Sequence, residues 1–284
     1  IFIKNKFNYK NIYHQMNQES CFALKINNFM KKILSETKIS KLYLPYESQT
    51  FQNKIISTSR NYNKKIKIYG YDHMISALPI NNIYKSSSPD FLLVHSNTHK
   101  NMYTKFFKWP KNKIIKIPSL RFFKKGRKFF DQAIFLPHNI LLKNELINNF
   151  EFFLSYISTK KIKPFNVKIH PLQKNVKEHK LFKNEINNLM KRYTKSFSTL
   201  SKKSYAVFFG ATSAVVEALE NGSNVIHIVS NATLESYSKK FWPYINVNRI
   251  SKNVFEYTLR KKNQCLNLTN RQVNLNFSDL RQKV

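Results

Sequence analysis

Two polar stretches in the second half of the chain contain side chains suited to binding an anion. The first is Lys168-Ile169-His170-Pro171 and the second is Gly210-Ala211-Thr212-Ser213, and each directly follows an apolar segment. An ammonium group, an imidazole and two hydroxyls can all donate hydrogen bonds to phosphate oxygens. Glu217 follows Ser213 by four residues, so its carboxylate lies on the same face of a helix. These residue types predict a nucleotide site, with the carboxylate toward ribose hydroxyls.

The segment 204–230 predicts how the second stretch is held. Tyr205–Phe209 is an apolar run of strand length, residues 215–219 have helical spacing, and Val225–Val229 is a second apolar run. A strand, helix and strand of this size predict a right-handed βαβ unit in a parallel sheet covered on both faces. The turn at Gly210 then lies at the carboxyl edge of the sheet, where open α/β folds bind ligands.

The first stretch ends a second expected strand, Phe165–Ile169. If the two strands are adjacent and parallel, His170 and the hydroxyls of Thr212 and Ser213 meet at one edge. A purely structural interpretation remains open, in which His170 only ends a strand and Glu217 belongs to a helix cap.

The whole chain repeats this alternation of strands and helices. We expect further strands at 41–46, 65–71, 91–95, 114–117 and 133–136, and helices at 19–34, 51–61, 96–109, 140–158 and 176–193, with Ser48 or Thr50 capping the second helix. The pattern favours an α/β fold with two Rossmann-like domains and a cleft between them.

The basic segment Arg121–Phe130 interrupts the alternation, and we interpret it as a domain linker. The domains are then 1–125 and 126–284, and the second contains the predicted nucleotide site. A basic and aromatic contact with nucleic acid is the alternative role for this segment. Because the first residue is Ile rather than Met, we interpret the N-terminal domain as lacking its start.

The formal net charge of +34 at pH 7 has two interpretations. Lys greatly outnumbers Arg, and Asn, Ile, Phe and Tyr are abundant too, which together indicate a genome rich in A and T. Lys also lacks the planar fork with which Arg recognises phosphates and bases. We therefore expect mostly solvated faces and no nucleic-acid partner. The alternative is a functional basic surface toward a phospholipid leaflet or an acidic glycan.

Several motifs are missing from the sequence. It contains no apolar run of the roughly 20 residues that span a membrane, no signal peptide, and no zinc-like spacing of Cys21 and Cys265. Asp-x-Asp, G-x-G-x-x-G, the P-loop motif and G-x-S-x-G do not occur either. We therefore expect a cytoplasmic protein without a bound metal or cofactor.

The two polar stretches resemble motifs of nucleotide-sugar glycosyltransferases of the GT-B architecture. His170-Pro171 ends a strand, and 40 residues later a strand leads into Gly210–Ser213 and a helix with Glu217. The pattern is most similar to that of bacterial sialyltransferases and polysialyltransferases, although Thr212-Ser213 stands where they have Ser-Ser. Similarity to proteins of bacterial surface-carbohydrate biosynthesis extends over most of the chain, including LPYESQTFQNK at 44–54.

The resemblance implies a donor site at His170, Thr212 and Ser213 and an acidic general base in the first domain. Glu47 is our candidate for that base, because it follows an expected strand. Asp72-His73 is the competing candidate. Alternatively, Glu47 only caps the next helix. The family's acidic-acidic-Gly motif does not surround Glu47.

The expected function is therefore a hexosyl- or sialyl-type glycosyltransferase. By resemblance, its donor is a nucleotide sugar, such as an acidic sugar linked to CMP, and its acceptor is a glycan or glycolipid, with peripheral contact to the inner membrane. Three alternatives remain: a nucleotide-sugar epimerase or hydrolase on the same scaffold, a non-catalytic basic protein that binds nucleic acid, and a degenerate or truncated transferase that has lost activity.

Overall fold

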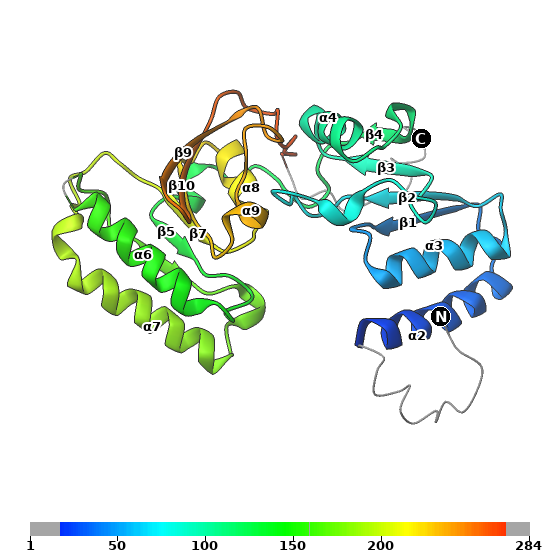
Figure 1. Ribbon diagram of the computed structural model, residues 1–284, viewed down its shortest axis with the longest axis horizontal. Coiled ribbons are helices and arrows are strands. Elements are labelled where there is room, and N and C mark those ends of the chain that lie inside the picture. The colour runs from blue at the N-terminus through cyan, green and yellow to red at the C-terminus, as the bar shows by residue number, and fades with distance from the viewer. Residues whose placement is uncertain (1–17, 159, 271–284) are drawn as a thin grey trace. The chain divides into compact units, whose positions relative to one another are not determined.

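The computed structural model describes residues 18–158 and 160–270, which form two compact units (Figure 1). The first unit takes its residues from 18–73, 80–94 and 103–115, and the second from 74–79, 95–102 and 116–270. The residues on which we based the expectation of a missing start, 1–10, lie outside the described residues. We describe each unit by itself.

The first unit is built on a four-stranded sheet in the order β1-β2-β3-β4. Its strands are β1 (Lys41–Pro45), β2 (Lys67–Tyr71), β3 (Phe91–Val94) and β4 (Ile114–Lys116). The first three strands are parallel, with Lys41 paired to Lys67 and Tyr69 to Phe91. The carboxyl ends of β1 and β2 therefore lie side by side, and the residues that follow them meet at one edge.

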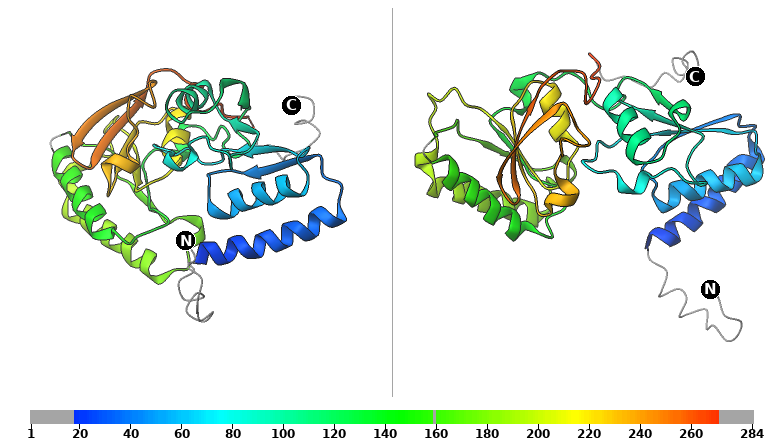
Figure 2. Two further views of the ribbon diagram at one scale, coloured as in Figure 1. Left: turned by 45° about the vertical axis from the view of Figure 1, so that its right-hand side comes forward. Right: turned by 45° about the horizontal axis from the view of Figure 1, so that its top comes forward.

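Helices α3 (Thr50–Tyr62) and α2 (Gln18–Glu36) lie on one side of this sheet, and α2 packs along α3 (Figures 1 and 2). Helix α4 (Asn97–Phe106) contributes Tyr103–Phe106 to the first unit, and short 3₁₀ turns lie at Ile80–Asn82 and Lys111–Lys113. The expected caps of α3 are wrong: the N-cap is Gln49, whose backbone N–H donates to the side chain of Gln52 at 3.1 Å.

The second unit contains a six-stranded sheet in the order β6-β5-β7-β8-β10-β9. Its strands are β5 (Ala133–Phe135), β6 (Asn166–Lys168), β7 (Ala206–Phe209), β8 (Val225–Ile228), β9 (Ile245–Ser251) and β10 (Val254–Leu259). The strands β6, β5, β7 and β8 are parallel, whereas β10 runs antiparallel to β8 and β9. The expectation of parallel strands is confirmed for these four, and the hairpin of β9 and β10 was missed.

The helices of the second unit cover both faces of its sheet. Helices α6 (Lys143–Ile157) and α7 (Lys177–Arg192) bury apolar side chains against one face, with Phe150, Phe182 and Phe209 in the shared core. Helix α8 (Ala214–Glu220) lies on the opposite face (Figure 1). The remaining turns are α5 (Arg127–Phe130), α9 (Ala232–Glu235), and 3₁₀ turns at Pro171–Gln173 and Thr194–Ser196.

The described residues thus confirm a mixed α/β fold with parallel strands and packed helices. Across 18–158 and 160–270, every helix is too short or too polar to cross a membrane.

Candidate functional site

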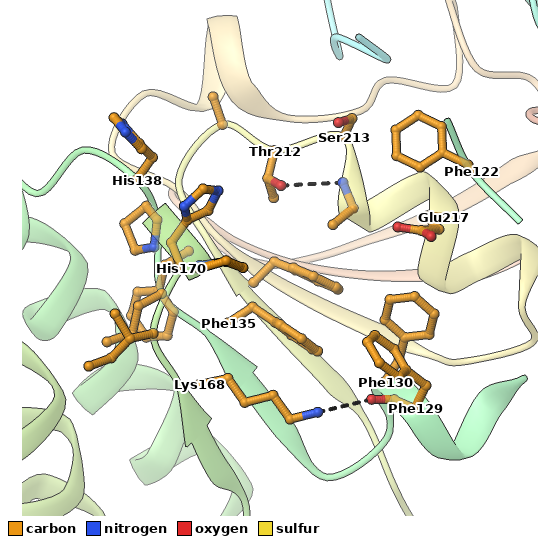
Figure 3. Close-up of a pocket in the computed structure, with 18 of the residues that line it drawn as sticks. Phe122, Phe129, Phe130, Phe135, His138, Lys168, His170, Thr212, Ser213 and Glu217 are labelled. Atoms are coloured by element: carbon orange, nitrogen blue, oxygen red, sulfur yellow. Dashed lines mark hydrogen bonds between the residues drawn. The ribbon is translucent and has the colours of Figure 1, made fainter. Parts of the chain in front are cut away.

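A cavity of about 530 Å³ opens at the carboxyl ends of β5, β6 and β7 in the second unit (Figure 3). The predicted adjacency of β6 and β7 is wrong, because β5 lies between them. The chain runs from β5 to β6 on one side of it and then from β6 to β7 on its other side. The strand order therefore reverses next to β5, which makes a topological switch point. Three strand ends, rather than two, therefore supply side chains to one crevice.

Five of the six residues expected to bind the donor line this cavity, and so does His170; the exception is Gly210. The cavity-lining residues include Lys168, Ile169, His170 and Pro171 from the end of β6, Pro137 and His138 from the end of β5, and Ala211, Thr212, Ser213 and Glu217 from the turn after β7 and from α8. Gly210 is the first residue of that turn. The structure thus places the predicted residues around one space.

His170 is held as a neutral imidazole. Its Nδ1 accepts a hydrogen bond from the backbone N–H of Leu172 at 3.3 Å, so the neutral ring carries its proton on Nε2. Burial lowers the pKa of His170, and neighbouring His138, His179 and Arg121 lower it further. The ring of His138 packs edge to face on it, with centroids 5.2 Å apart. His170 is therefore a hydrogen-bond donor to a ligand near neutral pH.

The hydroxyls of Thr212 and Ser213 lie at the start of α8. The Thr212 hydroxyl accepts a hydrogen bond from the N–H of Ala214 at 3.2 Å, which leaves its own proton available to a ligand. Ser213 is the N-cap residue, but its side chain makes no capping hydrogen bond. Because α8 has only seven residues, we assign the anion affinity to side chains rather than to the helix dipole.

The backbone of this turn is fixed from behind. Gly210 has φ of +67°, and a Cβ at this position would lie 3.4 Å from the Cβ of Pro137. Its carbonyl accepts a hydrogen bond from Nε2 of His227 at 2.8 Å. Burial lowers the pKa of His227 to about 4, so this imidazole is neutral. The Tyr237 hydroxyl lies 2.9 Å from the carbonyl of Thr212.

Glu217 lines the cavity as one member of an ion pair. Its Oε1 lies 2.8 Å from Nζ of Lys125, and the carboxylate is 6% exposed. Burial raises the pKa of Glu217, and Lys125 partly opposes that effect. The N–H groups of Lys125 and Gly126 both donate to the side chain of Asn221 at the end of α8. The expected linker Arg121–Phe130 therefore folds onto α8 and forms a wall of the cavity.

An aromatic wall faces these polar groups. The rings of Phe135 and Phe208 stack with centroids 4.7 Å apart. Nζ of Lys168 lies over the rings of Phe129 and Phe135, at 4.9 and 5.1 Å, and donates to the carbonyl of Phe129 at 3.1 Å. The rings hold the ammonium group at the cavity wall. The cavity therefore combines a flat apolar surface with fixed positive charge.

In the first unit, the two candidates for the general base lie together after β1 and β2. Oε1 of Glu47 is 3.1 Å from Nδ1 of His73, and Oε2 of Glu47 accepts from the side chain of Gln49 at 3.2 Å. Glu47 also lies next to the start of α3, where its N–H donates to Gln52 at 2.8 Å. The Glu47 side chain is 17% exposed. The side chain is therefore only partly buried.

Asp72 lies below this pair and has a different environment. It is 2% exposed, and its Oδ2 accepts a hydrogen bond from the Tyr103 hydroxyl at 2.8 Å. Burial raises the pKa of Asp72 to about 8; the Tyr103 hydrogen bond lowers it and the charge of Glu47 raises it. Asp72 is thus a protonated, buried acid at pH 7, which favours Glu47 over Asp72 as the solvent-accessible carboxylate.

Three contributors to the donor-side cavity were not selected from the sequence: His138, Lys125 and Phe135. His138 follows an expected strand, so its position at a strand end was the available signal. Lys125 and Glu217 are far apart in the chain, and no local pattern connects them.

No protein-family model, curated protein or solved structure with which we compared the chain matches it. Within residues 18–158 and 160–270, no three His, Cys, Asp or Glu side chains are grouped so that they could hold a metal ion.

Proposed function

We propose that the chain is a metal-independent glycosyltransferase with two Rossmann-like domains, which transfers a sugar from a nucleotide donor to a bacterial surface glycan. The observation that carries this proposal is the cavity at the switch point of the second unit. Its volume of about 530 Å³ suits a small-molecule ligand. Around it stand a neutral imidazole, two hydroxyls, two ammonium groups and stacked aromatic rings, a set that suits a nucleotide phosphate and base.

In the proposed reaction, Glu47 takes the proton from an acceptor hydroxyl, and the oxygen attacks the anomeric carbon of the donor sugar. The bond from that carbon to the phosphate oxygen breaks, and the electron pair leaves with the nucleotide. His170 and Lys168 stabilise the negative charge that develops on the phosphate. The contact of His73 with Glu47 supports this role, since an imidazole can share the proton that the carboxylate receives.

The identity of the substrates rests on the resemblance of His170-Pro171 and Gly210–Ser213 to sialyltransferase motifs. We propose a CMP-linked acidic sugar as donor and a glycan or glycolipid as acceptor. Lys125, Lys168 and Arg121 around the cavity suit an anionic donor, because Glu217 is the one carboxylate among the lining residues.

A binding screen with CMP, UDP, GDP and their sugars tests the donor site. We expect one nucleotide to bind, and His170→Ala to abolish that binding without loss of the fold. Leu172→Ala is the matched control, because Leu172 lies in the same loop, is 78% exposed and does not line the cavity. Unchanged affinity of the His170 variant for every nucleotide would refute the site.

Transfer assays test the base. Glu47→Gln should leave donor binding intact and lower turnover roughly 100-fold or more, the contribution typical of general base catalysis. Glu36→Gln, an exposed acid in the same unit, is the control. Donor consumption without any acceptor would instead indicate an epimerase or hydrolase. Nucleic-acid binding with a steep salt dependence and no nucleotide affinity would indicate the non-catalytic nucleic-acid-binding protein instead.

A further inference from the structure

The outer face of α2 exposes large apolar side chains beside lysines. Phe22 is 48% exposed and Phe29 is 60% exposed. They are seven residues apart, so they lie on the same side of the helix. Lys25 and Lys32 have the same spacing and form an exposed row next to the two rings. The opposite side of α2 buries Ala23, Met30 and Leu34.

Packing among residues 18–73, 80–94 and 103–115 leaves this face open. Helix α2 lies along α3, and the sheet lies on the far side of α3 (Figures 1 and 2). The ring of Phe22 packs edge to face against Phe51, with centroids 5.3 Å apart, and stays 48% exposed. Phe22 and Lys25 also line an open hollow of about 840 Å³ together with Ser48 and Gln49. The hollow is large enough to receive a lipid headgroup.

The lysines of this face are not held in ion pairs. Lys25, Lys31 and Lys32 form no ion pair with any residue in the described part of the chain. The two acidic residues of α2, Glu19 and Glu36, lie at its ends. A row of lysines beside exposed aromatic rings is typical of helices that lie in the interface of an anionic bilayer. There the rings enter the acyl boundary and the ammonium groups contact lipid phosphates.

We propose that the outer face of α2 docks on an anionic phospholipid bilayer. Two contributions act together: Phe22 and Phe29 become buried, and the lipid phosphates attract Lys25 and Lys32. Neutral lipid lacks the second contribution and free phosphate lacks the first, so neither should replace the anionic bilayer. This inference is independent of the reaction proposed above, and its test uses no nucleotide.

Sedimentation with vesicles of phosphatidylcholine, with and without one third phosphatidylglycerol, tests the proposal. We expect binding to the anionic vesicles only. Lys25→Gln with Lys32→Gln should weaken it roughly 30-fold, at about 1 kcal/mol for each lysine near the surface. Phe22→Gln with Phe29→Gln should weaken it similarly while keeping the charge. Circular dichroism verifies that each variant is folded.

The matched controls are Lys202→Gln with Lys203→Gln, which removes two exposed lysines of the second unit, and Leu200→Gln, since Leu200 is 92% exposed. Both should bind as the parent does. Equal losses in the Lys25/Lys32 and Lys202/Lys203 variants would overturn the proposal, because non-specific charge would then explain the binding. Light scattering that shows α2-dependent dimers instead of vesicle binding would also overturn it.

A spectroscopic test uses Phe29→Trp. The native Trp109 and Trp242 are 1% and 0% exposed, so their emission should not respond to lipid. We expect the emission of the new indole to shift to shorter wavelength with anionic vesicles and not with neutral ones. An unchanged spectrum on vesicles that sediment the protein would place α2 away from the bilayer and refute the assignment.

Discussion

His170 is neutral because its loop both buries the ring and surrounds it with other imidazoles and Arg121. The N–H of Leu172 fixes which nitrogen keeps the proton. A phosphate beside this ring would favour the charged imidazolium, so ligand binding and protonation of His170 are thermodynamically linked.

We therefore predict that affinity for a nucleotide sugar rises as the pH falls. The pKa of His170 is lowered in the free protein and raised by the bound phosphate, so binding takes up a proton between these two pKa values. Between these two pKa values, the affinity should increase about tenfold for each pH unit by which the pH falls. Below the pKa of His170 in the free protein, the affinity should level off. Calorimetry from pH 5.5 to 8 measures this. His170→Gln should remove the dependence; a slope that persists in this variant would assign the proton to another group.

A second prediction concerns Asp72 and stability. Its pKa of about 8 in the folded protein exceeds the ordinary aspartate value of 3.8, so between these values the folded state holds one more proton than the unfolded state. The contribution of Asp72 to the free energy of unfolding therefore decreases by about 1.4 kcal/mol per pH unit as the pH rises through this window. Asp72→Asn should abolish that decrease. Urea unfolding at pH 5 and 8 should show the variant gaining stability relative to the parent at the higher pH, and parallel curves would contradict the pKa.

At the scale of elements, α8 is flanked by two glycines with positive φ. Gly210 precedes it with φ of +67°, and Gly222 follows it with φ of +93°. A Cβ at Gly210 would approach Pro137, whereas one at Gly222 would meet only the flexible end of Lys262. Replacing either glycine by alanine should therefore strain the backbone. Only the replacement of Gly210 should also move the turn that lines the donor cavity.

We predict that Gly210→Ala and Gly222→Ala each lower the free energy of unfolding by about 1–2 kcal/mol, the cost of the left-handed region for alanine. Only Gly210→Ala should also weaken nucleotide binding, because it moves the carbonyl that His227 holds and the Thr212 and Ser213 hydroxyls beyond it. Calorimetry and urea unfolding separate the two effects. Equal nucleotide affinity in both variants would show that the turn does not position the ligand.

The sequence predicted where most helices and strands lie along the chain better than it predicted the order of the strands in the sheet. Buried apolar runs such as Ala206–Phe209 and Val225–Ile228 were identifiable as strands because both faces of the sheet are covered. The edge strand β9 was missed because its exposed residues, including Asn246, Asn248 and Arg249, interrupt the apolar pattern.

The neighbours of each strand could not be derived from local patterns. The position of β5 between β6 and β7 follows from long-range packing, so His138 was not expected beside His170. The pairing of Lys125 with Glu217 has the same origin. By contrast, strand-end residues such as His170, Thr212 and Glu47 were found, because polar side chains directly after apolar runs are visible in the sequence.

At the scale of the whole molecule, the formal charge of +34 opposes compaction. Like charges repel one another across the surface, and the repulsion is screened beyond the Debye length, which shortens from about 30 Å at 0.01 M salt to about 8 Å at 0.15 M. The 15 acidic residues are too few to offset the 49 basic ones. Lys125 and Lys143 each form an ion pair with a glutamate.

We predict that raising the salt concentration over this range raises the melting temperature by several degrees. The buried Trp109 of the first unit and Trp242 of the second report the unfolding of each. Chloride and sulfate at equal ionic strength should act alike if screening is the cause. A melting temperature that falls with salt would mean that attractive charge pairs outweigh the repulsion.

Glu220, at the end of α8, accepts hydrogen bonds from the backbone N–H groups of residues 263, 264, 265 and 266. Further along, the N–H of Asn267 donates to the carbonyl of His95, and the N–H of Ser119 donates to Asn267. During synthesis on the ribosome, this carboxylate has no native partner until some 45 more residues have been translated. The second unit therefore cannot complete its folding progressively from the N-terminal side, because α8 gains the four donors to Glu220 only when residues 263–266 have been made.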